Sequence, residues 1–308
     1  MLTTHPCQGL LDSLQAVIIG KEPTLKLVVA TLLAGGHVLL EDVPGVGKTL
    51  LARTLAQAVG GAWKRVQFSP DLLPSDITGV NVFNPASGEF RFVPGPIFAN
   101  VLLADEINRA SPRTQSSLLE AMEESRVTVD GETHTLAPPF LVIATQNPLE
   151  HHGTYPLPEA QLDRFAIAVS LGYPTPDEEQ RLLARSIGAQ PSGVVEAAIS
   201  PQDLAVWQAS VRQVRVDDSL QGYIVRVAQR SREHGQISIG ISPRGSLLWL
   251  RLSQAMAWLE GRDFVTPDDI RRTAVPVLAH RIQLAHRTGS GARRDVVAEL
   301  LGEIAVPD

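Results

Sequence analysis

The segment LLEDVPGVGKTLLA, residues 39–52, limits what this chain can fold into more than any other feature. It joins a short apolar run, HVLLE, to a run with apolar residues at helical spacing, KTLLARTLAQAVG. Gly47, Lys48 and Thr49 follow the spacing of a phosphate-binding loop, which needs a strand before it and a helix after it. Asp42 replaces the first glycine of that pattern, so the loop departs from the usual motif at its first position.

Composition allows a packed core and excludes several classes of protein. With 308 residues and 44% apolar content, the chain can form one large or two ordinary domains. A net charge of -6 argues against a surface built to bind nucleic acid. The single cysteine, Cys7, excludes an internal disulfide framework. Because no secretory signal precedes the loop and residues 25–40 are too interrupted to span a bilayer, we expect a soluble cytoplasmic protein without membrane insertion.

The order of the predicted elements favours an α/β core followed by a helical domain. VLLAD, FLVIATQ and AIAVSL are continuous apolar runs, typical of strands covered on both faces in a parallel sheet. From Pro174 onward, apolar residues recur at threes and fours, which predicts helices. We place the boundary at PTPDEEQ, so residues 1–173 are expected to form an α/β nucleotide-binding core and residues 174–308 a helical domain.

Two β-hairpins are predicted within the core. VNVF and FRFV, in residues 80–93, alternate in polarity and are joined by the turn-rich NPASGE. RVTV and ETHT flank Asp130 and Gly131, a pair favoured in type I′ turns. Either hairpin could contact a partner protein, or could be a plain surface hairpin at the edge of the sheet.

The glycine loop has the chemistry to hold a nucleotide. Backbone amides of Gly45 to Thr49 can surround the β-phosphate at the start of a helix, where unpaired N–H groups favour an anion. Lys48 would reach the β- and γ-phosphates, and the Thr49 hydroxyl would bind Mg²⁺. Since Asp42 opens the loop at the strand end, we expect its carboxylate to turn away from the nucleotide and to accept nearby N–H groups.

Polar groups also follow two other predicted strands. VLLADE ends in Asp105, which would hold Mg²⁺, and Glu106, which would orient and deprotonate the attacking water. In IATQNP, Asn147 could contact the γ-phosphate or that water, although asparagine before proline is also an ordinary turn. Because ligands bind at the carboxyl ends of strands in such sheets, the sequence predicts a Mg²⁺-dependent ATP site there.

Four longer motifs after the loop resemble one known family. DEINRASPRTQSSLLEAMEE, IATQNP, GTYPLPEAQLDRF and GISPRGSLLWLR occur in the order typical of the MoxR family of AAA+ ATPases. The resemblance covers roughly residues 18–287. It implies a P-loop AAA+ core with a parallel sheet flanked by helices, and a C-terminal all-α lid. It also implies a homo-oligomeric ring, usually a hexamer, with ATP sites between subunits.

The resemblance assigns roles to single residues. Lys48 and Thr49 match the Walker A pair, Asp105 and Glu106 the Walker B pair, and Asn147 matches sensor 1. The residues expected to contact ATP, including an adenine-binding segment, are Ile18, Ile19, Gly20, Pro44, Gly45, Val46, Gly47, Lys48, Thr49 and Leu50.

Two arginines are implied as further catalytic residues. Arg164, in LDRF, matches the arginine finger that reaches a neighbour's γ-phosphate, and Arg244, in SPRG, matches sensor 2. A guanidinium suits both positions because its charge is fixed and its donors are planar. From spacing alone, Arg164 could instead pair with an adjacent acid, Asp163 or Glu159. Two other candidates for the trans-acting finger are Arg109 and Arg113.

The function implied is Mg²⁺-dependent ATP hydrolysis that remodels, activates or matures a protein client in a chaperone-like role. The resemblance also implies a partner with a von Willebrand factor A domain, because MoxR-like proteins often act with such partners. Three alternatives remain: a magnesium-chelatase-like motor subunit, a nucleotide-gated binding scaffold without turnover, and a DNA-directed AAA+ motor.

Other polar residues have simpler interpretations. His151 and His152 are adjacent and lack the i, i+4 spacing of a helical metal pair, so we expect a solvated loop. The C-terminal arginines lie among acids, and we expect them on a solvated lid surface: Arg271, Arg272, Arg281, Arg287, Arg293 and Arg294.

Overall fold

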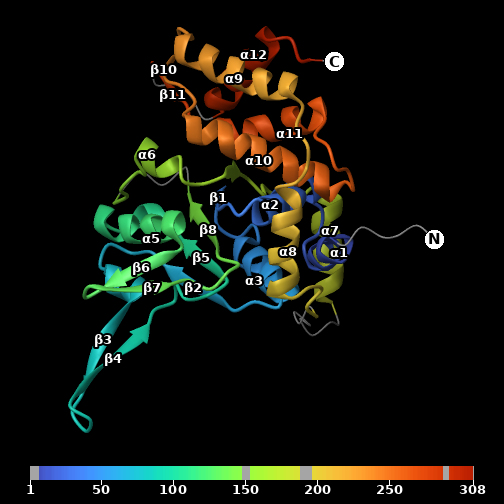
Figure 1. Ribbon diagram of the computed structural model, residues 1–308. Coiled ribbons are helices and arrows are strands. Elements are labelled where there is room, and N and C mark those ends of the chain that lie inside the picture. The colour runs from blue at the N-terminus through green and yellow to red at the C-terminus, as the bar shows by residue number, and fades with distance from the viewer. Residues whose placement is uncertain (1–6, 148–152, 188–195, 287–290, 308) are drawn as a thin grey trace.

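A five-stranded parallel sheet forms the centre of the molecule (Figure 1). The computed structural model describes residues 7–147, 153–187, 196–286 and 291–307, so the expectations for His151, His152 and Arg287 lie outside it. The strands lie in the order β2-β5-β8-β1-β9. Their bounds are β1 (Val38–Glu41), β2 (Trp63–Gln67), β5 (Val101–Asp105), β8 (Leu141–Gln146) and β9 (Ile167–Val169).

The sheet separates two apolar cores, because alternate residues of each strand face opposite sides. Along β5, Val101 and Leu103 belong to one core, whereas Leu102 and Ala104 belong to the other. The first core lies against α1 (Gln8–Val17), α2 (Glu22–Leu33) and α3 (Lys48–Ala58) and continues into the C-terminal helices. The second core lies against α4 (Pro74–Thr78), η1 (Ile107–Arg109), α5 (Pro112–Glu124) and α6 (Glu159–Leu162). The continuous strands predicted from sequence are therefore covered on both faces.

The chain after residue 174 is mainly helical, as its periodicity predicts. Its elements are α7 (Pro176–Ser186), α8 (Pro201–Val211), α9 (Asp218–Glu233), β10 (Ile237–Ile239), α10 (Pro243–Leu259), α11 (Pro267–Leu278), β11 (Gln283–Leu284) and α12 (Ala292–Glu303). Four of these helices begin at a serine or threonine followed by proline, with the hydroxyl accepting a backbone N–H of the first turn: the caps are Thr175, Ser200, Ser242 and Thr266.

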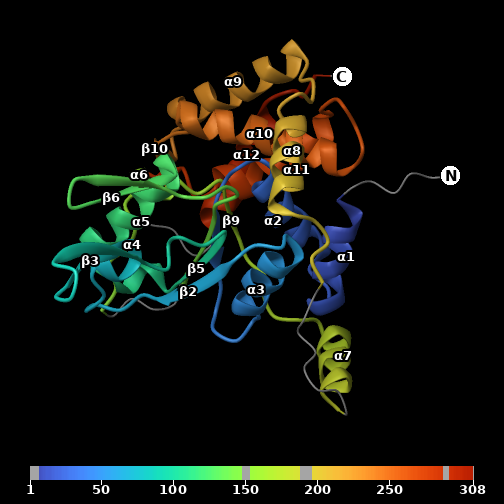
Figure 2. The same ribbon diagram turned by 60° about the horizontal axis from the view of Figure 1, so that its bottom comes forward.

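The C-terminal helices occupy two places around the core. Helix α10 packs on α2, and α11 packs against β9 at the edge of the sheet. Helix α7 instead lies beside α1, apart from α9 to α12 (Figure 2). A hydrogen bond of 2.8 Å from Arg185 Nη1 to the carbonyl of Ala16 joins α7 to the end of α1. Among the described residues, no helix is both long and apolar enough to cross a membrane.

Both predicted hairpins are confirmed, and they contact each other. β3 (Gly79–Asn84) pairs with β4 (Glu89–Pro94), and β6 (Arg126–Val129) pairs with β7 (Glu132–Thr135). The Phe92 and His134 rings stack at 4.0 Å between centroids, and Asn81 Nδ2 donates to Asp130 Oδ2 at 2.9 Å. The pair β3 and β4 extends away from the body of the molecule (Figure 1). The exposed Phe83 and Phe90 form a cross-strand pair on it.

Candidate ATP site

The phosphate loop lies between β1 and α3, as predicted. Gly45 and Gly47 have left-handed backbones, with φ of 87° and 96°, and no other group lies within 4 Å of the position that a Cβ would take on either residue. Gly47 is the N-terminal cap of α3, so the first amides of that helix face the loop. The loop thus has the open backbone cradle that a phosphate requires. Pro44, Val46 and Leu50 complete the loop and the helix start, and all three are at least partly accessible.

Lys48 closes the loop on itself. Its Nζ donates to the carbonyl oxygens of Asp42 and Val43, at 2.9 and 3.1 Å. The ammonium therefore lies inside the curve of the loop, where an anion would meet it. Thr49 follows on the first turn of α3 and is partly accessible.

Asp42 turns away from the loop amides, as predicted. Its carboxylate is buried, with only 4% of the residue exposed. It accepts hydrogen bonds from Ser170 Oγ at 2.6 Å, from the Leu171 N–H at 2.7 Å and from the Gly172 N–H at 2.9 Å. The acid that breaks the loop motif thus anchors the segment between β9 and α7 to the start of the loop.

The predicted adenine segment is attached to that same connection. Ile18 caps the end of α1, and Gly20 has a φ of 72°. A Cβ on Gly20 would meet the carboxylate of Glu178 on α7, and the positive φ of this residue favours glycine. Lys21 Nζ donates to the Tyr173 carbonyl at 2.7 Å. The structure therefore fixes residues 18–20, including the buried Ile19, against the connection that Asp42 also holds.

Asp105 and Glu106 lie at the carboxyl end of β5, which is separated from β1 by β8. Because these strands are parallel, the two acids and the phosphate loop lie at the same end of the sheet, which we call the carboxyl edge. Asp105 Oδ1 accepts from the Thr145 hydroxyl at 2.7 Å, and its Oδ2 accepts from Arg65 Nη2 at 2.6 Å. The Thr145 hydroxyl also accepts the Glu106 N–H at 2.9 Å. These contacts orient the Asp105 carboxylate, and carboxylate and hydroxyl oxygens are the donors that suit Mg²⁺.

The Glu106 side chain accepts hydrogen bonds from Gln67 and Arg109. Gln67 was not identified from the sequence, and Arg109 was considered only as a candidate for the trans-acting finger. The Glu106 backbone is left-handed, with a φ of 57°. Its Oε2 accepts from Gln67 Nε2 at 2.7 Å and from Arg109 Nη1 at 2.9 Å. Gln67 and Arg65 both lie on β2, a strand that the sequence interpretation did not predict. Arg65 and Gln67 alternate with the buried Val66 and Phe68, which was the available signal.

Asn147 lies immediately after β8 and is partly buried. Gln146, the residue before it, donates from Nε2 to Glu41 Oε1 at 2.7 Å, and its carbonyl accepts the Asp42 N–H at 3.3 Å. Asn147 is therefore carried by the strand end that pairs with the start of the phosphate loop.

Arg164 and Arg244 lie together, but near the amino ends of the parallel strands, which we call the amino edge. Both bind one carboxylate near the end of α5: Arg244 Nη1 donates to Glu123 Oε1 at 2.8 Å, and Arg164 Nε lies 3.3 Å from Glu123 Oε2. The preceding residue, Met122, accepts a hydrogen bond of 3.0 Å from His37 at the amino end of β1. This end is opposite to the one that carries the phosphate loop, and the four residues of β1 span about 13 Å.

The rival arginines occupy different positions. Arg109 Nη1 binds Glu106 of the same chain, and Arg113 is exposed on the first turn of α5. The sequence also allowed Arg164 to pair with Asp163 or Glu159. In the structure its carboxylate partner is Glu123 instead. The adjacent Asp163 binds Arg281 and Ser242 instead.

The expected solvent exposure of Arg281 is wrong. Only 4% of this residue is exposed, because its guanidinium is enclosed by α11 and by residues 163–166. The other described arginines of that group are exposed as predicted: Arg271, Arg272, Arg293 and Arg294.

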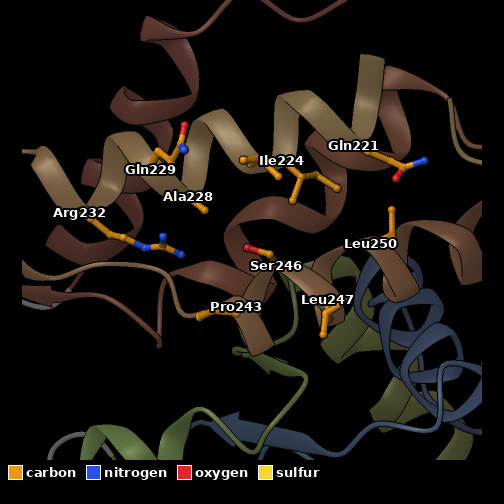
Figure 3. Close-up of a pocket in the computed structure, with 10 residues that line it drawn as sticks. Gln221, Ile224, Ala228, Gln229, Arg232, Pro243, Ser246, Leu247 and Leu250 are labelled. Atoms are coloured by element: carbon orange, nitrogen blue, oxygen red, sulfur yellow. The ribbon is translucent and has the colours of Figure 1, made fainter. Parts of the chain in front are cut away.

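A cavity of about 430 Å³ lies elsewhere, between α9 and α10 (Figure 3). Its wall is largely apolar and includes Ile224, Ala228, Leu247 and Leu250, with Arg232 at one end. None of the residues predicted to bind ATP lines it.

One cluster resembles a metal-binding set by composition. Single ligand atoms of His234, Glu299 and Glu303 lie within 4.8 Å of one another. The Gln236 N–H donates to His234 Nδ1, so in the neutral ring the proton is on Nε2, which faces Glu303. Arg230 Nε also donates to Glu303, at 2.8 Å. These contacts describe an ion-pair cluster that joins α9 to α12 rather than a preformed metal site.

Comparisons with known proteins agree with this arrangement. Residues 37–167 match the family described as "ATPase family associated with various cellular activities (AAA)", and residues 229–300 match an AAA lid domain. The chain is 50% identical to YeaC of Bacillus subtilis (strain 168) over 307 residues, covering 98% of this chain and 96% of that protein. It is 41% identical to Chaperone MoxR1 of Mycobacterium tuberculosis over 291 residues, covering 92% and 77%.

Two further proteins are similar to this chain. Protein MoxR of Paracoccus denitrificans is 31% identical over 297 residues, covering 89% of this chain and 87% of that protein. The crystal structure of a Cytophaga hutchinsonii protein assigned as an ATPase has a TM-score of 0.89 at 35% identity, covering 98% and 95% of the two chains. With the phosphate loop, the paired acids and the helical lid in place, this chain belongs to the MoxR family of AAA+ ATPases.

Proposed function

We propose that this ATPase hydrolyses ATP at sites completed between subunits of a homo-oligomeric ring. The observation that carries this proposal is the separation of the two halves of the site. The phosphate loop and the acids lie at the carboxyl edge of the sheet, whereas Arg164 and Arg244 share Glu123 at the amino edge. Because β1 separates the two ends of the sheet by about 13 Å, these guanidiniums are placed to reach a γ-phosphate on another subunit rather than on their own loop. A head-to-tail contact of this kind closes into a ring, and we propose a hexamer.

In this ring the carboxyl edge of one subunit binds the nucleotide. Lys48 and the loop amides hold the phosphates, and residues 18–20 contact the adenine. Thr49 and Asp105 would hold Mg²⁺, which neutralises charge on the phosphate oxygens. Glu106 takes a proton from the attacking water, and Asn147 orients that water or the γ-phosphate.

The neighbouring subunit supplies positive charge. Arg164, as the arginine finger, and Arg244, as sensor 2, would stabilise the charge that develops on the transferred phosphoryl group. Because Arg244 is on α10, movement of the helical domain would change the site of the next subunit. We keep residues 1–173 as the nucleotide-binding core and residues 174–308 as the lid, since the last core strand, β9, ends shortly before α7.

We further propose that the cycle acts on a protein client in a chaperone-like role in the cytoplasm. The name of the relative Chaperone MoxR1 supports that role, and a partner with a von Willebrand factor A domain fits the family. The paired hairpins offer exposed aromatic side chains, Phe83 and Phe90, for such a contact. An affinity pulldown of the Glu106→Gln protein with ATP should retain the client, and a pulldown equal to that without ATP would argue against this role.

The test of hydrolysis is Mg²⁺-dependent phosphate release by the wild type and by Glu106→Gln. Loss of the general base should lower turnover by about 10² to 10⁴-fold while ATP binding persists. The matched control is Glu120→Gln, an exposed acid on α5 that should leave turnover unchanged. A wild type that binds ATP but releases no phosphate, even when assembled, would instead indicate a nucleotide-gated scaffold.

A further inference from the structure

Arg281 has the most complete set of contacts of the buried charged groups near the amino edge. Its Nε donates to Asp163 Oδ1 at 2.9 Å, and Nη2 donates to the Asp163 carbonyl at 3.1 Å. Nη1 donates to the Ala166 carbonyl at 3.1 Å. The carbonyls of Phe165 and Val277 accept further bonds from Nη2 and Nη1. A guanidinium has five N–H donors, and these five acceptors can satisfy all of them, while His280 Nε2 also lies 2.8 Å from Nη1.

Because its N–H donors all have acceptors, the Arg281 guanidinium can be buried at the edge of the core. Burial lowers the pKa of Arg281 to about 10, and the Asp163 carboxylate opposes that effect. Arg281 therefore stays charged at neutral pH. Three of its acceptors are backbone carbonyls on either side of Arg164, namely those of Asp163, Phe165 and Ala166. The guanidinium thus fixes the backbone from which Arg164 projects.

The same cluster also holds the start of α10, which carries Arg244. Ser242 Oγ donates to both Asp163 carboxylate oxygens, at 3.1 and 3.0 Å, and accepts the Gly245 N–H at 3.0 Å as the helix cap. A Cβ on Gly245 would lie 2.9 Å from Arg281 Cδ, so the glycine leaves room for the Arg281 side chain. The motifs LDRF and SPRG are thereby joined through Asp163 and Arg281.

We infer that Arg281 is a positioning residue that holds Arg164 and Arg244 as one rigid unit, so that both guanidiniums meet the neighbouring nucleotide together. This inference rests on the proposed function, in which the two arginines act in trans. Because Arg281 follows α11 by three residues and Ser242 caps α10, whereas Asp163 belongs to the core, the unit joins the helical domain to the core at this end of the sheet. The two arginines therefore keep a fixed spacing when the subunit meets its neighbour.

Arg281→Lys tests the inference because lysine keeps the charge but cannot reach five acceptors arranged around a planar group. We expect kcat to fall by about 10- to 100-fold, as small misplacements of catalytic groups do, with ATP affinity within about twofold of the wild type. Binding should survive because the phosphate loop lies at the opposite edge of the sheet. If ATP binding and kcat fell in parallel with the folded fraction, Arg281 would have only a structural role.

A second measurement distinguishes positioning from stability. In an Arg164→Lys, Arg244→Lys background, which keeps a cation at both positions, Arg281→Lys should lower kcat by less than about twofold more. This follows because Arg281 acts through these two arginines. If the losses multiply instead, Arg281 does not act through them and the inference is overturned.

Ser242→Ala supplies a milder variant in case Arg281→Lys does not fold. It removes the link from Asp163 to α10 and a helix cap. Ser200→Ala removes the corresponding cap of α8 without touching Asp163, so it is the matched control. We expect a kcat loss of about tenfold for Ser242→Ala only. Equal kcat values for the two variants would overturn the link.

The failures of the two proposals can be told apart. If wild-type protein shows no Mg²⁺-dependent turnover, or if Arg164→Ala subunits are never rescued by neighbours, then the proposed function fails first. If turnover and rescue are observed but Arg281→Lys retains full kcat, only the positioning inference fails.

Discussion

The two edges of the parallel sheet hold their polar groups in different ways. At the carboxyl edge, the phosphate loop is open, and its glycines lie beside unfilled space. At the amino edge, Asp163 and Arg281 form an enclosed ionic cluster that ties the lid helices to the core. The first arrangement is suited to accept a ligand, whereas the second is suited to hold two side chains in place.

The polar groups at the two ends of the sheet also differ in how far apart they lie in sequence. The groups that bind phosphate come from short, contiguous motifs, but the arginines depend on contacts between distant parts of the chain. Arg281 and Asp163 are 118 residues apart in sequence. In the proposed function, a subunit has its two half-sites at opposite ends of the sheet and is incomplete alone. This can be tested by placing the two half-sites on different chains.

The largest expected effect comes from mixing subunits. Arg164→Ala should lower phosphate release by about 10³-fold or more while the variant still binds ATP. Lys48→Ala should also be inactive, because it loses the cation of the phosphate loop. Mixed at equal concentration, the two should regain part of the wild-type rate, since Lys48→Ala subunits supply Arg164 to intact loops. The measurement is phosphate release as a function of mixing ratio.

Arg113→Ala is the comparison variant for that experiment, because Arg113 is exposed on α5 and was the rival finger. It should retain most of its activity alone. If only Arg113→Ala shows complementation with Lys48→Ala, then the trans-acting role belongs to Arg113 and the two-edge description is wrong.

The next effect concerns the anchor at the carboxyl edge. Asp42→Asn replaces a buried carboxylate that accepts three hydrogen bonds with an amide that presents donors to donors. We expect a loss of about 2 to 4 kcal/mol in the free energy of unfolding, measured by denaturant titration. ATP affinity should stay equal or weaken, because the connection that also holds residues 18–20 loosens.

An exposed acid of α1 provides the control: Asp12→Asn should change neither quantity. Markedly tighter ATP binding by Asp42→Asn would mean that the native carboxylate repels the phosphates, against the orientation described above.

Much of the fold could be predicted because the signals were local. The phosphate loop, strands β1, β5, β8 and β9, both hairpins and the helices from α7 to α11 follow from apolar spacing, turn residues and caps. Asp42 was also predicted correctly, since its position at the strand end leaves its carboxylate free to accept N–H groups outside the loop. Apart from the partners of Asp42, which are 128 to 130 residues away, each of these features is set by residues close together in sequence.

The features that were missed depend on tertiary contacts. β2 is an edge strand with mostly exposed side chains, so WKRVQ lacks the continuous apolar run of its neighbours. Its Arg65 and Gln67 reach Asp105 and Glu106 only after β2 pairs with β5. Glu123 stands in an acidic run with nothing in the sequence to single it out. Arginine is usually exposed, and burial of Arg281 requires acceptors from a distant segment.

A smaller effect is expected at the amino edge from Glu123. Its carboxylate neutralises Arg164 and Arg244 in the described form, so a neighbour's γ-phosphate must compete with it. Glu123→Gln should therefore raise phosphate release at subsaturating ATP by about two- to tenfold, since exposed ion pairs are individually weak. Glu124→Gln, which alters the pair with Arg126, is the control. A lower rate would mean that Glu123 orients the arginines productively.

The smallest effect is a pH dependence of stability at the same edge. The His37 ring is buried at the start of β1; Nδ1 accepts the Val142 N–H and Nε2 donates to the Met122 carbonyl. Burial lowers the pKa of His37 to about 4, and the nearby charge of Arg244 acts in the same direction. Its protonation is therefore easier in the unfolded chain, and stability falls as pH decreases from about 6.5 toward 4.

His37→Gln removes this titration and separates it from that of every other group. Between about pH 7 and pH 5.5, the wild type should lose about 1 kcal/mol more unfolding free energy than His37→Gln, measured by urea unfolding at both values. Parallel losses in the two proteins would mean that His37 does not stay neutral in the fold. A larger loss in the wild type would show that protonation of His37, where β1 meets the end of α5, opposes folding.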